Sequence, residues 1–209
     1  MTLDELVALT RTELVTLGLG KLCIDPLIIS RLNSAYRLFV TGVGNIDDEV
    51  EIEVVANDVD VPYPDWVLKF RHITLDGEPL AIVNPSDVDF MRVTASSEPQ
   101  LFVIGDRVGY AKVFGAPKSN GTLFAKVQRE IKAEMLLGSD SPVDVPASHQ
   151  IALIDWAVAQ FLMTDERETI RVTMMRDRLS RFAMAIESVK TLFSRKRTKP
   201  IRTVRYGGI

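Results

Sequence analysis

The sequence predicts an α+β protein in which helices from both chain ends form a bundle and a strand-rich region is inserted between them. Apolar residues recur at helical spacing in the first 45 residues and again after residue 141. The segment between them alternates apolar and polar residues and is punctuated by glycine and proline. We expect four regions: N-terminal bundle helices at 1–45, a β-rich insertion at 46–140, C-terminal bundle helices at 141–194, and an extended basic tail at 195–209.

Two helices are predicted in the N-terminal region. Thr2 and Glu5 form the T-x-x-E pattern of a capping box, and Gly18 gives a stop signal for the first helix. Asp25 and Pro26 predict the start of the second helix, with Asp25 as its N-cap. The buried face of this helix is predicted by apolar residues at gaps of four, three and four: Ile28, Leu32, Ala35 and Phe39.

The insertion is predicted to form a small antiparallel sheet or partial barrel. Residues 50–54 alternate valine and isoleucine with acids, which indicates a half-exposed strand. A strand at 66–75, a turn at 76–79 and a return strand at 80–83 predict a hairpin, and residues 84–87 predict a short helical turn. Three more strands are predicted at 101–104, 110–114 and 122–131, with turns at 105–106 and 119–121.

Eight acids follow one another in this insertion with no intervening base: Asp47, Asp48, Glu49, Glu51, Glu53, Asp58, Asp60 and Asp65. A calcium loop would place acids at alternate positions around a glycine turn, whereas these acids alternate with valine and isoleucine along a strand. They therefore predict a solvated strand face and an acidic loop. The alternative is an acidic surface that meets a basic surface on a neighbouring subunit.

The last third of the chain is predicted to be helical. A first apolar face consists of Ile151, Ile154, Val158 and Phe161. Thr164 is expected to cap a long final helix whose first turn contains Asp165 and Glu166. Six apolar residues at alternating gaps of four and three then form a stripe that we expect to pack on helices from both chain ends: Met175, Leu179, Phe182, Ile186, Val189 and Phe193.

The sequence shows no motif for catalysis or for cofactor binding. The glycines at 16–22 lack phosphate-loop spacing, and those at 42–44 lack the third glycine of a dinucleotide fingerprint. His72 and His149 have no metal-binding partner at ligand spacing, and Cys23 is the only cysteine. We therefore expect no catalytic residues, no metal site and no cofactor, and we predict that the protein is not an enzyme.

The C-terminus is the segment with the most unusual charge. Seven of the 25 Lys and Arg residues, and none of the 28 Asp and Glu residues, lie in 188–209, so the rest of the chain carries a net charge of -10. Apolar residues occur between these charges, at Ile201, Val204, Tyr206 and Ile209. Because solvating tails lack such anchors, they favour docking in an acidic protein groove. The alternative is a nucleic-acid-binding module whose bases contact phosphates.

The order of these parts resembles that of tailed-phage head-to-tail connectors, the adaptor or tail-tubular type of neck protein. Three segments carry the resemblance. Residues 59–77 are similar to an extended segment with proline and Asp that leads into a strand and a D-G turn. Residues 121–131, 144–146 and 151–162 are similar to the last strand, proline loop and apolar helix of such adaptors, and residues 164–167 to the start of their last helix.

The resemblance implies a structural protein of the virion neck, present in the host cytoplasm during assembly. Such adaptors form a dodecameric ring below the portal, extend the DNA channel and receive a downstream tail or tail-terminator protein. Their partners are themselves, the portal, that tail protein, and packaged DNA that passes without sequence-specific contact. Portal docking would fall here on the C-terminal segment: Arg195, Lys196, Arg197, Lys199, Ile201, Arg202, Val204, Arg205, Tyr206 and Ile209.

Overall fold

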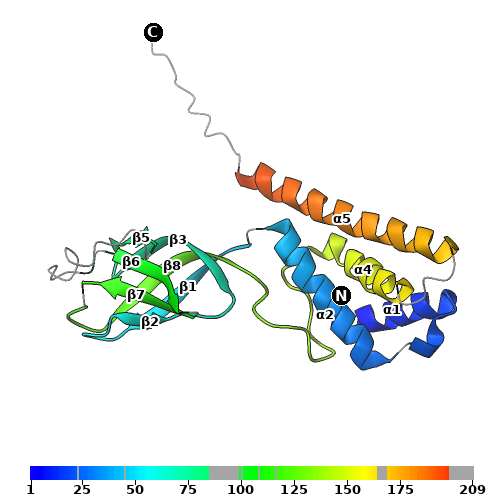
Figure 1. Cartoon of the computed structure of the whole chain (residues 1–209), viewed down its shortest axis with the longest axis horizontal. Helices are drawn as coiled ribbons and strands as arrows, with labels where there is room; N and C mark the ends of the chain where they lie inside the picture. The colour runs from blue at the N-terminus through cyan, green and yellow to red at the C-terminus, as the bar shows by residue number, and fades with distance from the viewer. Residues whose placement is uncertain are drawn as a thin grey trace, which may run out of the picture. The chain divides into compact units, whose positions relative to one another are not determined.

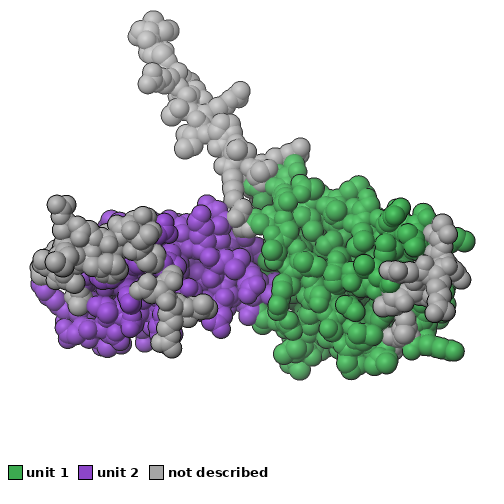
Figure 2. Space-filling view, viewed as in Figure 1, with its two compact units in different colours: residues 1–44, 133–209 green, residues 45–132 purple. Residues whose placement is uncertain are grey.

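Both ends of the chain fold into one helical unit, and the middle of the chain forms a separate β unit (Figure 2). The helical unit contains Met1–Gly44 and Ala133–Ile209, and the β unit contains Asn45–Lys132. The predicted α+β class with an inserted β region is confirmed, although the β unit ends eight residues before the predicted boundary at residue 140. The computed structural model describes residues 1–22, 24–44, 46–84, 99, 101–107, 109–115, 117–163 and 169–197.

The described residues of the helical unit form four α-helices, which Figure 1 labels. They are α1 (Leu3–Thr16), α2 (Asp25–Val43), α4 (Ile151–Leu162) and α5 (Thr169–Arg197), with short 3₁₀ helices at Gly20–Leu22 and Ala147–His149. The predicted capping box is confirmed. The Glu5 N–H donates to Thr2 Oγ1 at 3.3 Å, and the Thr2 N–H donates to Glu5 Oε2 at 2.9 Å. These two bonds satisfy backbone donors that α1 itself cannot satisfy.

The start of α2 differs from the prediction. Ile24 is the N-cap residue and makes no side-chain capping bond, while Asp25 is the first helical residue. The Asp25 carboxylate forms an ion pair with Arg11 of α1, so it joins two helices instead of capping one. The predicted inner face is confirmed, since Ile28, Leu32, Ala35 and Phe39 are all completely buried.

The inner faces of the C-terminal helices agree with the prediction except at one position. Within α4, three of the four predicted residues are buried, but Ile151, the first residue of the helix, is 61% exposed. Figure 1 shows α5 running alongside α4. Phe182 and Val189 of the α5 stripe are buried, and its other four members are partly covered. Thr164, Asp165 and Glu166 lie outside the described residues.

Aromatic and glycine contacts hold α5 against its neighbours. The Phe182 ring meets Phe39 of α2 edge-on at 5.9 Å between centroids and lies 6.3 Å from Trp156 of α4. A Cβ on Gly42 would lie 2.9 Å from Ile186 Cδ1, so glycine at this position allows the close approach of α2 and α5. The stripe therefore packs on helices from both chain ends, as expected.

The described residues of the β unit form two four-stranded sheets, where the sequence predicted a single small antiparallel sheet or partial barrel. The first sheet has the order β1 (Ile46–Val54), β8 (Gly121–Arg129), β3 (Val67–Leu75), β4 (Glu78–Pro79). The second has the order β2 (Asp60–Pro62), β7 (Tyr110–Phe114), β6 (Leu101–Arg107), β5 (Ala81–Val83). Every pairing is antiparallel except that of β5 with β6.

Two local predictions within the β unit need correction. The β4 strand falls within the predicted turn at 76–79 and pairs with β3, whereas β5, within the predicted return strand at 80–83, pairs with β6 in the other sheet. The turn predicted at residues 105–106 lies inside β6. The pairing of β6 with β7 shifts in register between Ile104 and Arg107, and this irregularity accommodates Gly105 within the strand. The turn at Asp76 and Gly77 is confirmed, with φ of 50° and 92°. Residues 85–87 of the predicted helical turn lie outside the described residues.

The two sheets share an apolar core. Phe70 of β3 and Phe102 of β6 meet at 4.9 Å between ring centroids, and Tyr63 packs edge-on against Phe70 at 5.2 Å. Alternation along β1 follows the prediction, with Val50, Ile52 and Val54 buried and the acids between them exposed. Among the described residues, no helix is long and apolar enough to cross a membrane.

Candidate functional site

The segment predicted to dock on a partner begins on a helix. Residues 195–197 form the last helical residues of α5, so the extended tail predicted from residue 195 can begin only at residue 198. The side chains of residues 194–197 lie outside the described residues, as do residues 198–209. The predicted portal-binding residues Lys199, Ile201, Arg202, Val204, Arg205, Tyr206 and Ile209 are therefore placed only by their position after α5.

One arginine near the middle of α5 connects this helix to two others. Arg178 Nη1 lies 2.8 Å from Asp155 Oδ1 of α4, and Arg178 Nη2 pairs with Glu13 of α1. Only 16% of the Arg178 side chain is exposed. Burial raises the pKa of Asp155, and the nearby Arg178 and Arg181 guanidiniums oppose this without cancelling it. The network holds α5 in place upstream of the predicted docking segment.

The acids of β1 are largely paired within the β unit itself. Asp47 lies 3.4 Å from Arg71 Nε, and Glu49 lies 3.6 Å from Lys126 Nζ. Asp48 Oδ2 lies 2.5 Å from Arg129 Nε and 2.8 Å from Lys132 Nζ. The sequence suggested an unbroken acidic surface because the bases that pair with these acids come from β3, from β8 and from the residues just after β8.

Asp48 is the most strongly held of these acids. Burial alone would raise its pKa, but hydrogen bonds from Lys132, the Glu49 N–H and Arg129 outweigh it and lower the pKa to about 2. The Lys132 ammonium also lies 4.9 Å from the centre of the Trp66 ring. The acids at this end of β1 are therefore neutralised within the β unit. Farther along the strand, Glu51 and Glu53 are exposed.

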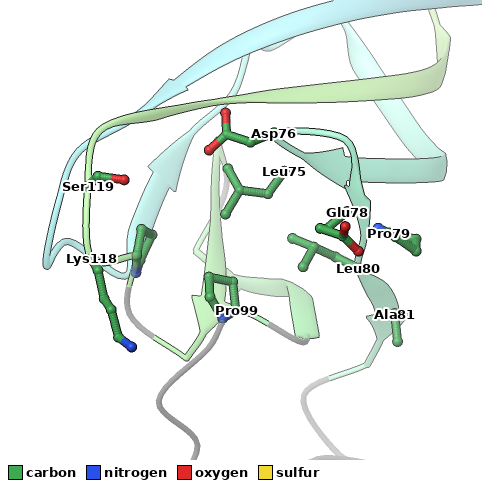
Figure 3. Close-up of a pocket in the computed structure, with 10 residues that line it drawn as sticks. Leu75, Asp76, Glu78, Pro79, Leu80, Ala81, Pro99, Lys118 and Ser119 are labelled. Carbon is green, nitrogen blue, oxygen red and sulfur yellow. The ribbon is translucent and has the colours of Figure 1, made fainter.

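A pocket of about 690 Å³ opens in the β unit (Figure 3). Its lining is mainly apolar, with three charged side chains: Leu75, Asp76, Glu78, Pro79, Leu80, Ala81, Pro99, Pro117, Lys118 and Ser119. The Asp76 carboxylate already accepts the Thr122 N–H at 3.0 Å, which stabilises the turn after β3. The described residues of the lining include neither histidine nor cysteine.

The two histidines lie in different units. His149 Nδ1 is 2.9 Å from Ser148 Oγ, and its Nε2 is 3.3 Å from Ser188 Oγ of α5, while His72 lies on β3. Within the described part of the chain, no group of three or more His, Cys, Asp or Glu side chains could hold a metal ion.

A loop in the helical unit carries exposed apolar side chains that the sequence did not single out. The loop at 133–146 connects the β unit to the short 3₁₀ helix before α4. Leu136 is 72% exposed, Leu137 67% and Val143 80%. Their neighbour Met135 is buried, so the loop has one side in the core and another side toward solvent. No sequence pattern predicts this exposure, because apolar residues in a loop have no periodicity.

The comparison with protein families decides the identity of the chain. The SU10 adaptor protein family model matches residues 1–203, which is nearly the whole sequence. The chain belongs to the SU10 adaptor family. The resemblance to head-to-tail adaptors is thereby confirmed, and this adaptor is a structural phage protein of the head-to-tail junction, where it associates with portal and tail proteins. No curated protein matches the chain.

Proposed function

We propose that this adaptor assembles as a dodecameric ring under the portal, extends the DNA channel, and gives the tail its attachment surface. The family match over residues 1–203 carries this proposal. The architecture supports it, since neither unit shows a catalytic constellation among its described residues and the surface features are suited to contacts between chains. In the ring, packaged DNA passes without sequence-specific contact.

The C-terminal segment is proposed to dock on the portal. Its bases and apolar anchors run from Arg195 to Ile209, and the first three bases extend α5. Because α5 is tied to α1 and α4 through Arg178, the segment starts from a fixed helix. A segment of this kind that orders on binding gains specificity from its apolar anchors and attraction from its charges.

Truncation after Arg197 tests the docking role. Removal of 198–209 leaves every described helical residue in place, so the thermal melting profile should not change. Binding to the portal ring, measured by co-sedimentation, should be lost. A truncated adaptor that still binds the portal as tightly as the full chain would contradict the proposal.

Two further variants separate a protein groove from nucleic acid as the partner of the segment. The triple variant I201S/V204S/Y206S keeps every charge, and the double variant R202Q/R205Q keeps every apolar anchor. Docking on the portal requires both the charges and the apolar anchors, so each variant should weaken it. Binding to duplex DNA would depend on the bases alone and would fall steeply with salt. Two results together would favour the nucleic-acid-binding alternative. The triple variant I201S/V204S/Y206S would bind the portal normally, and only the double variant R202Q/R205Q would lose affinity for DNA.

A further inference from the structure

The 133–146 loop is held in shape from several sides. Asn33 of α2 brackets Met135, because its Nδ2 donates to the Met135 carbonyl at 2.9 Å and its Oδ1 accepts the Met135 N–H at 2.8 Å. The Asp140 carboxylate accepts the N–H groups of Leu136 and Leu137, both at 2.8 Å. These two hydrogen bonds lower the pKa of Asp140, so the carboxylate stays ionised.

The start of α1 and the middle of α2 hold the rest of the loop. The Leu3 N–H donates to the Asp140 carbonyl at 2.7 Å, and Tyr36 Oη donates to Asp144 Oδ2 at 2.8 Å. Gly138 lies so close to α1 that a Cβ there would collide with the Asp4 carboxylate. A loop ordered to this degree presents Leu136, Leu137 and Val143 to solvent in a fixed arrangement, which is typical of a contact surface rather than of a frayed connection.

A second surface lies on α2 itself. Leu27, Arg31, Ser34 and Leu38 follow one another at gaps of four, three and four, so they form a stripe along one side of the helix. Leu27 is 37% exposed and Leu38 47%. Arg31 lies between them and is partly exposed, while its Nε is buried inside the chain with no hydrogen-bond partner among the described residues. The arginine gives the stripe a positive charge, which is suited to an acidic partner.

The two surfaces face different ways around α2. Asn33 and Arg37 face the loop, since Asn33 bonds to Met135 and Arg37 pairs with Glu134 at 2.8 Å. At about 100° per residue, the direction of the Leu27–Leu38 stripe is roughly 110° from the direction of these two residues. The loop of one copy therefore does not cover the stripe of the same copy, and a second copy is the natural partner.

The two surfaces also complement each other in charge. The loop contains Glu134, Asp140 and Asp144 and no base, and Asp4 of α1 adjoins it at Gly138. The stripe contains Arg31 and no acid. Apolar side chains surrounded by acids thus match apolar side chains that flank an arginine.

We propose that the 133–146 loop of one adaptor copy packs on the Leu27–Leu38 stripe of α2 in the next copy. This inference rests on the proposed ring and names its subunit contact. Because the two surfaces differ, the contact is heterologous and leaves one free loop and one free stripe on every pair of copies. Repetition of such a contact closes a ring when the rotation between copies divides a full turn.

Paired substitutions in the full-length chain test this contact. The loop variant is L136S/L137S, the stripe variant is L27S/L38S, and the matched control is Leu68→Ser, which changes a 62% exposed leucine of the β unit. The four side chains are exposed, so circular dichroism melting should be unchanged in all variants. In mass photometry, each double variant should raise the protein concentration needed for half-assembly by about tenfold or more, and the control should match the wild type.

Mixing the two double variants gives the most specific readout. The loop variant retains an intact stripe and the stripe variant retains an intact loop, so an equimolar mixture has one productive contact per pair. At a concentration at which each variant alone is monomeric, the mixture should form 1:1 dimers and nothing larger.

The outcomes separate this contact from the ring itself. If the wild type forms rings and the loop variant forms them at the same concentration, the proposed subunit contact is contradicted, whereas the proposed ring assembly is supported. A mixture that stays monomeric overturns the heterologous pairing. If the wild type stays monomeric even with portal rings present, the proposed ring fails and this inference fails with it.

Discussion

The helical unit and the β unit each contain a charged cluster around an arginine, and the two clusters behave in opposite ways. Arg178 in the helical unit is 16% exposed and Arg129 in the β unit 10%, so the two arginines are similarly buried. In the first cluster, burial dominates and the pKa of Asp155 is raised. In the second, hydrogen bonds dominate and the pKa of Asp48 falls to about 2. The balance between burial of the carboxylate itself and the donors around it decides the sign of the pKa shift, whereas burial of the arginine does not.

The two clusters also connect different parts of the structure. Arg178 joins α1, α4 and α5, which come from both ends of the chain. Arg129 and Lys132 join the end of β8 to the adjacent strand β1. Loss of the first should loosen the packing of three helices, whereas loss of the second should act locally at one end of a sheet.

The largest expected effect sharpens this comparison. Replacement of Arg178 by methionine leaves the partly buried Asp155 without its counter-charge, which should cost about 2–4 kcal/mol of unfolding free energy. The matched change Arg129→Met leaves Asp48 with Lys132 and should cost about 1–2 kcal/mol. Urea unfolding of both variants measures the difference. Equal losses would mean that the two clusters contribute alike.

A smaller effect is expected from pH. Because the pKa of Asp48 is lower in the folded chain than its ordinary 3.8, its contribution is present above about pH 4 and is lost as the pH falls toward 2. After allowance for solvent screening, it should amount to about 1 kcal/mol. Asp155 has the opposite pH dependence. Because its pKa is raised in the folded chain, its ionisation as the pH increases lowers the free energy of unfolding.

The variant Asp48→Asn isolates the contribution of Asp48 to the pH dependence of the unfolding free energy. Urea unfolding at pH 5 and at pH 2.5 should show a smaller loss of stability on acidification for Asp48→Asn than for the wild type. An unchanged pH dependence would show that the hydrogen bonds around Asp48 do not stabilise its ionised form.

The smallest effect is expected on the opposite, exposed face of the same strand. The Glu49 and Lys126 side chains are 78% and 65% exposed and lie 3.6 Å apart, so Lys126→Ala should change the unfolding free energy by less than about 0.5 kcal/mol. A loss above about 1 kcal/mol in urea unfolding would mean that the exposed pairs stabilise β1 as much as the Asp48 cluster does.

Structural features that depend on residues close together in the sequence were predictable from the sequence. The Thr2 and Glu5 capping box, the turn at Asp76 and Gly77, and the buried face of α2 all depend on residues only a few positions apart. The acids of β1 were correctly predicted to alternate with buried residues, because strand periodicity is also local.

Features that depend on distant residues were not predictable. Asp25 stands before Pro26 in a pattern typical of an N-cap, yet its carboxylate forms an ion pair with Arg11 of another helix. Arg129 pairs with Asp48 across 81 positions. The shape of the 133–146 loop depends on Asn33, 102 positions from Met135, so its exposed leucines could not be inferred from the loop alone.

Electron microscopy of the purified full-length adaptor, alone and mixed with portal rings of its virus, tests the central claim most directly. The account predicts adaptor rings that stack on the portal and share a continuous central channel with it. Adaptor that remains monomeric and never associates with the portal would contradict it.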